Sequence, residues 1–136
     1  MRSRWKLLPV ALVLPLLMGH DTGGCGGGDG VEFGPPTGST CPPDSTLTWD
    51  SFGHEFMDSY CTRCHASTLT GADRQGAPLY HDFDTVQGVR NVANHVDYMA
   101  AAGPDAINTQ MPIDDGATPT LGERKQLGEW LACGAP

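Results

Sequence analysis

Three residues in close succession have types and a spacing that can do chemistry. They are Cys61, Cys64 and His65, in the run Cys61-Thr62-Arg63-Cys64-His65. Residues three and four positions apart lie on the same side of a helix, so all three side chains can project from one turn. Two thiols and an imidazole placed in this way can form two thioether bonds to a haem and supply an axial nitrogen to its iron. The motif therefore predicts one haem c, attached through Cys61 and Cys64, with His65 as the proximal ligand.

Three other interpretations of the motif are weaker. A thioredoxin-type pair sits at the start of a helix after a strand, whereas this pair lies at the end of an expected helix with no strand nearby. A zinc site needs a second pair of ligands at a suitable spacing, and the remaining Cys and His residues offer none. A disulfide between Cys61 and Cys64 has poor geometry within a helix.

The start of the chain has the pattern of an export signal. Three basic residues precede an apolar run from Leu7 to Met18, which is too short to span a bilayer, since a span needs about 20 apolar residues. Gly23-Gly24-Cys25 is similar to the end of a bacterial lipoprotein signal. It predicts a signal peptide at 1–24 and a lipid on Cys25 that holds the protein at the periplasmic side of a membrane. Cleavage at another small residue, without a lipid, is the alternative.

Composition and charge limit what the rest of the chain can be. Residues 25–45 are rich in Gly, Pro, Ser and Thr and predict a flexible tether. Residues 46–136 then suffice for one small domain. The formal net charge of −8 argues against nucleic-acid binding, because a phosphate backbone attracts a basic surface. The sequence has no Ser-His-Asp set, pair of catalytic carboxylates or phosphate-binding loop, so no enzymatic activity is predicted.

Three segments with helical periodicity are expected to position the motif. The expected helices run from 48 to about 65, from 84 to about 103 and from 120 to about 134. Thr120 and Glu123 have the spacing of a capping box at the start of the third. No alternating run is long enough for a useful strand, which predicts an all-α fold. Long loops at 67–83 and 105–117 are expected to have a function or to wrap something.

The motif and these helices together resemble a class I c-type cytochrome over about 46–133. That family has a glycine in its first helix, eight residues before the first haem cysteine, where the last helix crosses closely. Gly53 stands at this position, and Trp130 or Leu127 would meet it from the last helix. The resemblance implies a small cytochrome c-type fold of about three main helices and long loops wrapped round one covalent haem.

The resemblance also implies the remaining haem contacts. Pro78 matches a proline whose carbonyl accepts the second imidazole N–H of the proximal histidine. Met111, followed by Pro112 in the loop before the last helix, matches the distal iron ligand. Ligation of both faces by histidine, with His81 or His95 as the second ligand, is the alternative.

Two further implications concern the cysteines and the core. If the first and last helices cross as in that family, Cys41 and Cys133 come near each other, and a disulfide between them uses the even number of thiols left after lipidation of Cys25. The haem would be the central apolar body of the domain. The residues expected to pack around it are Phe52, Phe56, Tyr60, Leu79, Val89, Val96, Ile107 and Leu127.

The function implied by the resemblance is electron transfer, since an iron with two axial ligands has no open site for chemistry. An acidic carrier would favour redox partner proteins with basic docking patches, and lipidated Cys25 would attach it to the membrane. One alternative is a haem-binding subunit of a larger oxidoreductase. The other, if Met111 does not bind, is a haem enzyme or gas sensor with an open iron site.

Overall fold

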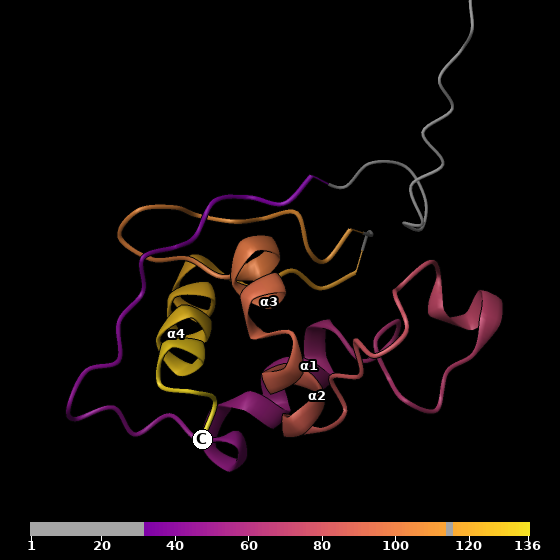
Figure 1. Ribbon diagram of the computed structural model, residues 1–136, viewed down its shortest axis with the longest axis horizontal. Helices are drawn as coiled ribbons and strands as arrows, with labels where there is room; N and C mark the ends of the chain where they lie inside the picture. The colour runs from indigo at the N-terminus through magenta and orange to yellow at the C-terminus, as the bar shows by residue number, and fades with distance from the viewer. Residues whose placement is uncertain (1–31, 114–115) are drawn as a thin grey trace, which may run out of the picture.

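The fold is known from a computed structural model that describes residues 32–113 and 116–136. Its helices are α1 (His54–Tyr60), α2 (Val86–Asn91), α3 (Ala93–Ala100) and α4 (Leu121–Ala132), with a π-helical turn at Trp49–Gly53 and a 3-10 turn at Gly71–Arg74. Apart from one isolated bridge, the described residues contain no β-structure, so the all-α class is confirmed. In Figure 1, α3 and α4 lie side by side, and the loop at 66–83 extends away from the helices. The predicted signal peptide and Cys25 lie outside the described residues.

The first helical segment begins where the sequence predicts and ends earlier. The Thr48 hydroxyl accepts from the Ser51 N–H, and the segment continues through the π-helical turn into α1. It ends at Tyr60, because Cys61 leaves the helical conformation with φ −123°. The motif is therefore not the last turn of the helix, as predicted, but a turn of its own directly after α1.

The expected second helix is two helices. Val92, with φ −132° and ψ 30°, separates α2 from α3. Thr85, rather than Asp84, caps α2, and its hydroxyl accepts from the Gly88 N–H at 3.1 Å. The Asp84 carboxylate instead accepts from the Ser67 hydroxyl at 2.6 Å, so it fastens the end of the 66–83 loop.

The start and end of α4 are as predicted. Thr120 and Glu123 form the reciprocal capping box. Gly134 follows the helix with φ +84°, a left-handed conformation that glycine adopts without steric cost. The Tyr60 hydroxyl donates to Glu123 at 2.8 Å, and this bond ties the end of α1 to the start of α4.

The core forms where the first helical segment crosses α4. Trp130 is fully buried, and a Cβ added at Gly53 would collide with its indole ring. The missing side chain is what lets the two segments approach, so the predicted crossing at Gly53 is confirmed, with Trp130 as the partner. Phe52 packs edge-on against the same indole, with ring centroids 6.1 Å apart.

The residues expected around a haem divide into two groups. Four are buried in the core: Phe56, Val89, Val96 and Leu127. Phe52 and Tyr60 are partly buried and pack against that core. Leu79 and Ile107 are instead 67% and 58% exposed, because the loops that carry them lie outside the helical core.

A disulfide closes the domain. Cys41 and Cys133 are bonded, with Cα atoms 4.7 Å apart and a sequence separation of 92. This is the pairing that the resemblance implies. In the chain-entropy model, closing a loop of this length stabilises the folded state by up to about 4–5 kcal/mol.

Part of the predicted tether is packed structure. Residues 34–41, which we call the N-terminal strap, lie along α3 and the chain that follows it. Thr37 is 1% exposed, and its N–H and hydroxyl both donate to the Asp97 carboxylate. The Gly34 N–H donates to the Tyr98 carbonyl at 3.0 Å. The predicted domain boundary at residue 46 is therefore too late, because hydrogen bonds hold the strap where apolar burial could not.

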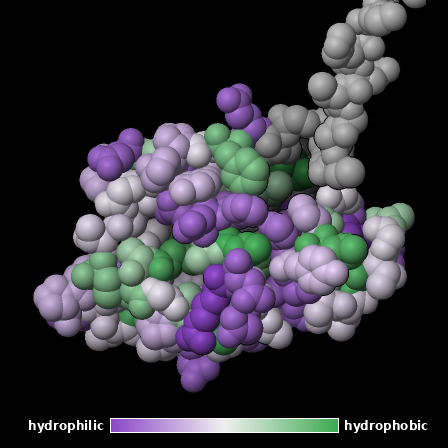
Figure 2. Space-filling view, in the orientation of Figure 1, coloured by the Kyte–Doolittle hydropathy of each residue, from purple (hydrophilic) through white to green (hydrophobic). Residues whose placement is uncertain are grey.

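The surface is mixed in character. On the face drawn in Figure 2, hydrophilic residues predominate and smaller hydrophobic areas lie between them. In the part of the chain that the structure describes, no helix is long and apolar enough to cross a bilayer.

Candidate functional site

The Cys61–His65 motif forms a closed turn directly after α1. The N–H groups of Cys64 and His65 both donate to the Cys61 carbonyl, at 3.2 and 3.0 Å. Cys61 and Cys64 are free thiols, whereas the cysteines near the two chain ends are bonded to each other. The turn therefore presents two unpaired thiols and an imidazole from one short stretch of backbone.

Cys61 lies in an environment unlike that of a catalytic cysteine. Burial raises the pKa of its thiol to about 12, although the charges of Arg124 and Arg63 oppose the rise. Thiol–disulfide exchange needs the thiolate, and cysteines that perform it have lowered pKa values. The environment of Cys61 therefore argues against the thioredoxin-type interpretation.

His65 is oriented and neutral. Its Nδ1 lies 3.3 Å from the His81 carbonyl; since a carbonyl can only accept, Nδ1 carries the proton and Nε2 keeps its lone pair. The ring stacks on Phe83 at a centroid distance of 4.7 Å. Burial is the main reason that the pKa of His65 falls to about 4, and the neutral imidazole is the form that binds a metal.

The carbonyl that orients His65 is not the predicted one. The Pro78 carbonyl accepts from Arg74 Nη2 at 2.8 Å, and the His81 carbonyl, three residues later, faces His65 instead. The reason is the course of the loop, because Arg74 draws the Pro78 carbonyl to its own guanidinium.

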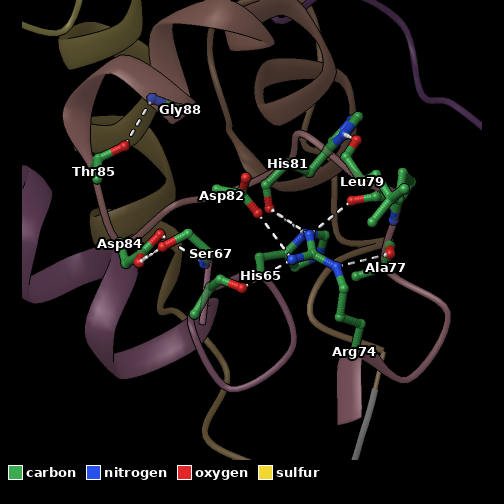
Figure 3. A network of polar contacts seen from close by, with 12 residues as sticks. His65, Ser67, Arg74, Ala77, Leu79, His81, Asp82, Asp84, Thr85 and Gly88 are labelled. Carbon is green, nitrogen blue, oxygen red and sulfur yellow. Dashed lines mark hydrogen bonds and ion pairs between the residues drawn. The ribbon is translucent and has the colours of Figure 1, made fainter. Parts of the chain in front are cut away.

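Arg74 is the centre of a polar network that sequence reasoning missed (Figure 3). It is 4% exposed. Its Nη1 donates to the Ala66 carbonyl at 2.8 Å and to the Asp82 carboxylate at 2.9 Å. Its Nη2 also reaches the His81 carbonyl at 3.3 Å. One guanidinium thus bonds to both ends of the 66–83 loop and holds them close to His65.

His81 and His95 are in contact with each other, and His81 is near His65. His81 Nε2 is 3.1 Å from His95 Nδ1, and the His81 ring centroid is 6.2 Å from that of His65. The Nδ1 of His65 points to the backbone of His81, and Nε2 lies on the other side of the imidazole.

Met111 is held close to the motif by Arg124. Arg124 Nη1 donates to the Met111 carbonyl at 3.0 Å, and the same guanidinium acts on the Cys61 thiol. The Met111 N–H donates to the Met99 carbonyl at 2.9 Å. Both Met111 and Cys61 are partly buried and pack against the hydrophobic core. One buried arginine therefore bonds the backbone of Met111 and lowers the pKa of the Cys61 thiol.

The chain beyond Met111 returns to the motif. A Cβ added at Gly116 would collide with the Arg63 guanidinium, and Arg63 lies between the two free cysteines in sequence. The segment that carries Met111 thus approaches the motif at its start through Arg124 and at its end through Gly116.

The residues present fit a haem. Leu79, Tyr80 and Ile113 are 67%, 80% and 62% exposed, and they lie on the two segments that follow His65 and Met111. Gln110 Oε1, next to Met111, is buried without a hydrogen-bond partner, although buried polar groups are normally bonded. Exposed apolar side chains and an unpaired acceptor beside the predicted ligands are consistent with contacts to a group other than the polypeptide.

A metal ion held by protein side chains alone would need a different set of residues from a haem. Within residues 32–113 and 116–136, no group of three or more His, Cys, Asp or Glu side chains could hold a metal ion. A haem does not need such a group, because the porphyrin supplies the equatorial nitrogens and the chain adds the axial ligands.

Comparisons with protein-family models, with curated proteins and with solved structures found no match for this chain.

Proposed function

We propose that the chain is an electron-transfer protein with one covalent haem, similar to class I c-type cytochromes. One observation carries this proposal: two free thiols and a neutral, carbonyl-oriented His65 project from a single turn. A redox-active cysteine pair would have a lowered pKa, and a structural pair would be oxidised. Covalent attachment of a haem uses both thiols and leaves the imidazole for the iron.

Each residue of the site has a distinct role in this proposal. Cys61 and Cys64 would hold the haem, and His65 Nε2 and the Met111 sulfur would bind its iron. A haem held in this way carries one electron through the change of iron valence. The chain's own contribution is to fix the ligands: the His81 carbonyl orients His65, and Arg124 holds the backbone of Met111.

We further propose that the protein is exported, with Cys25 as the lipid attachment point at the periplasmic side of a membrane. The basic start, the short apolar run and Gly23-Gly24-Cys25 support this. With a formal net charge of −8, the carrier would favour redox partners with basic docking patches in weak, salt-sensitive encounters.

Expression with the haem-maturation machinery, followed by visible spectroscopy and redox titration, tests the function. A carrier should titrate as a single reversible one-electron centre, and its reduced form should not bind carbon monoxide, since Met111 fills the sixth position. Rapid binding of carbon monoxide by the reduced wild type would instead support an enzyme or sensor. A second chain that co-purifies stoichiometrically would support the subunit alternative.

A further inference from the structure

We propose that Arg74 raises the reduction potential of this site by sharing the carbonyl that orients His65. The inference deepens the proposed function and rests on it, because it concerns the electronic state of the proximal ligand. Arg74 is thus a positioning residue that acts through the His81 carbonyl rather than a ligand.

The geometry places two donors on one acceptor (Figure 3). The His81 carbonyl lies 3.3 Å from His65 Nδ1 and 3.3 Å from Arg74 Nη2. Both distances exceed the usual N–H···O separation of about 2.9–3.0 Å. The carbonyl therefore bonds weakly to the imidazole and to the guanidinium, rather than closely to the imidazole alone.

The hydrogen bond at Nδ1 tunes the other nitrogen of the ring. A strong acceptor at Nδ1 makes a metal-bound imidazole more basic, which favours the ferric iron and lowers the reduction potential. A guanidinium that competes for this acceptor weakens the effect. Its positive charge, which is almost fully buried, also disfavours the additional positive charge of the ferric state.

Asp82 opposes Arg74. Its carboxylate accepts from Arg74 Nη1 at 2.9 Å and is itself 29% exposed. It draws the guanidinium away from the His81 carbonyl and offsets part of the charge. Loss of Asp82 should therefore have the opposite effect on the potential to loss of Arg74.

The opposite effects expected for Arg74 and Asp82 distinguish an influence on the reduction potential from simple support of the loop. Arg74 and Asp82 brace the same loop, so either substitution would loosen it. If the two residues only supported the loop, both substitutions would expose the site and shift the potential in the same direction. A change of opposite sign requires that their charges act on the site, and exchange of the His65 Nδ1 proton tests the shared carbonyl.

The experiment compares redox titrations of the haem-loaded full chain with Arg74→Gln and Asp82→Asn. Lys125→Gln and Asp73→Asn make the same charge changes at exposed positions. We expect Arg74→Gln to shift the equilibrium toward the oxidised form by about tenfold, or about 59 mV for one electron. Asp82→Asn should shift it toward the reduced form, and the two controls should have much smaller effects. Shifts of the same sign, or shifts no larger than those of the controls, would overturn the inference.

Exchange of the His65 Nδ1 proton gives a second readout. In Arg74→Gln the carbonyl is left to the imidazole alone, so proton exchange measured by NMR should slow; faster exchange would indicate a loosened loop and contradict the proposal. If Arg74→Gln does not fold, the sign of the shift in reduction potential in Asp82→Asn decides whether the inference holds. If the wild type carries no haem, the proposed function and this inference fail together. If it carries haem and the potentials do not respond, this inference alone fails.

Discussion

The surroundings of His65 determine the orientation and the protonation state of its imidazole. The imidazole is stacked on Phe83, bonded at Nδ1 and kept neutral by burial, with its pKa lowered to about 4. An exposed histidine has a pKa near 6.5 and is partly protonated in weak acid. The folded chain therefore keeps Nε2 unprotonated over a wider pH range than a free histidine would.

Met111 can be tested at the residue scale. Oxidised wild type should show the weak near-infrared charge-transfer band of a ferric thioether bond. Met111→Ala should abolish this band, open the iron to carbon monoxide in the reduced state and lower the potential, since the soft ligand that favours ferrous iron is lost.

Met99→Leu is the matched control for Met111. Met99 is a partly buried residue of α3 whose carbonyl accepts from the Met111 N–H, and a volume-conserving swap usually costs less than about 1.5 kcal/mol. The band should survive it. Loss of the band in Met99→Leu, with retention in Met111→Ala, would assign the ligand to Met99.

At the scale of residues, the sequence could predict the motif but not the residues that hold it in place. Cys61, Cys64 and His65 are recognisable because their spacing is local. Arg74, Arg124 and His81 act through backbone carbonyls, which carry no signature in sequence. Charged residues are rarely buried, so no periodicity marked either arginine.

At the scale of elements, the site depends on the crossing between the first helical segment and α4. The crossing brings Trp130 against Gly53 and buries Leu127. α1 then ends beside the start of α4, where Tyr60 bonds Glu123. The motif follows α1 directly, so the position of the crossing determines where the thiols lie.

Gly53→Ala tests this crossing. The added methyl group would collide with the Trp130 indole, and overpacking of a core costs about 1–3 kcal/mol. We expect a lower denaturant midpoint for the haem-loaded protein. Gly122→Ala makes the same change on an open part of α4, where the added Cβ would lie 3.8 Å from the Thr120 hydroxyl, and it should be neutral or stabilise by up to about 1 kcal/mol. Equal effects of the two changes would show that the crossing is not tightly packed at Gly53.

Local signals predicted the ends of elements well and their continuity poorly. The caps at Thr48 and Thr120 follow from side chains that bond backbone N–H groups within three residues. The break at Val92 has no such local cause. The apolar periodicity from Val86 to Ala100 continues through it, and so the sequence predicted one helix where there are two.

For the whole molecule, the strap shortens the stretch of chain expected between Cys25 and the packed domain. The predicted tether extended to residue 45, but packed structure already includes Gly34, only nine residues after Cys25. Composition could not predict this, because the strap is polar and is held by buried hydrogen bonds such as that from Thr37 to Asp97.

Lipidation is the prediction at this scale. Cys25→Ser should move the protein from the membrane fraction to the soluble periplasm and leave the haem spectrum unchanged, because Cys25 is none of the residues proposed to bind the haem. Recovery of the wild type in the soluble fraction, with an unmodified N-terminus, would refute the anchor while leaving the haem site untouched.

The most direct test of the central claim is the mass of the denatured chain after expression with the haem-maturation machinery. We predict a mass increased by one haem that survives denaturation. Cys61→Ala or Cys64→Ala should weaken this retention, and the double variant should abolish it. A wild-type chain that is matured under these conditions and still has the mass of the polypeptide alone would contradict the account.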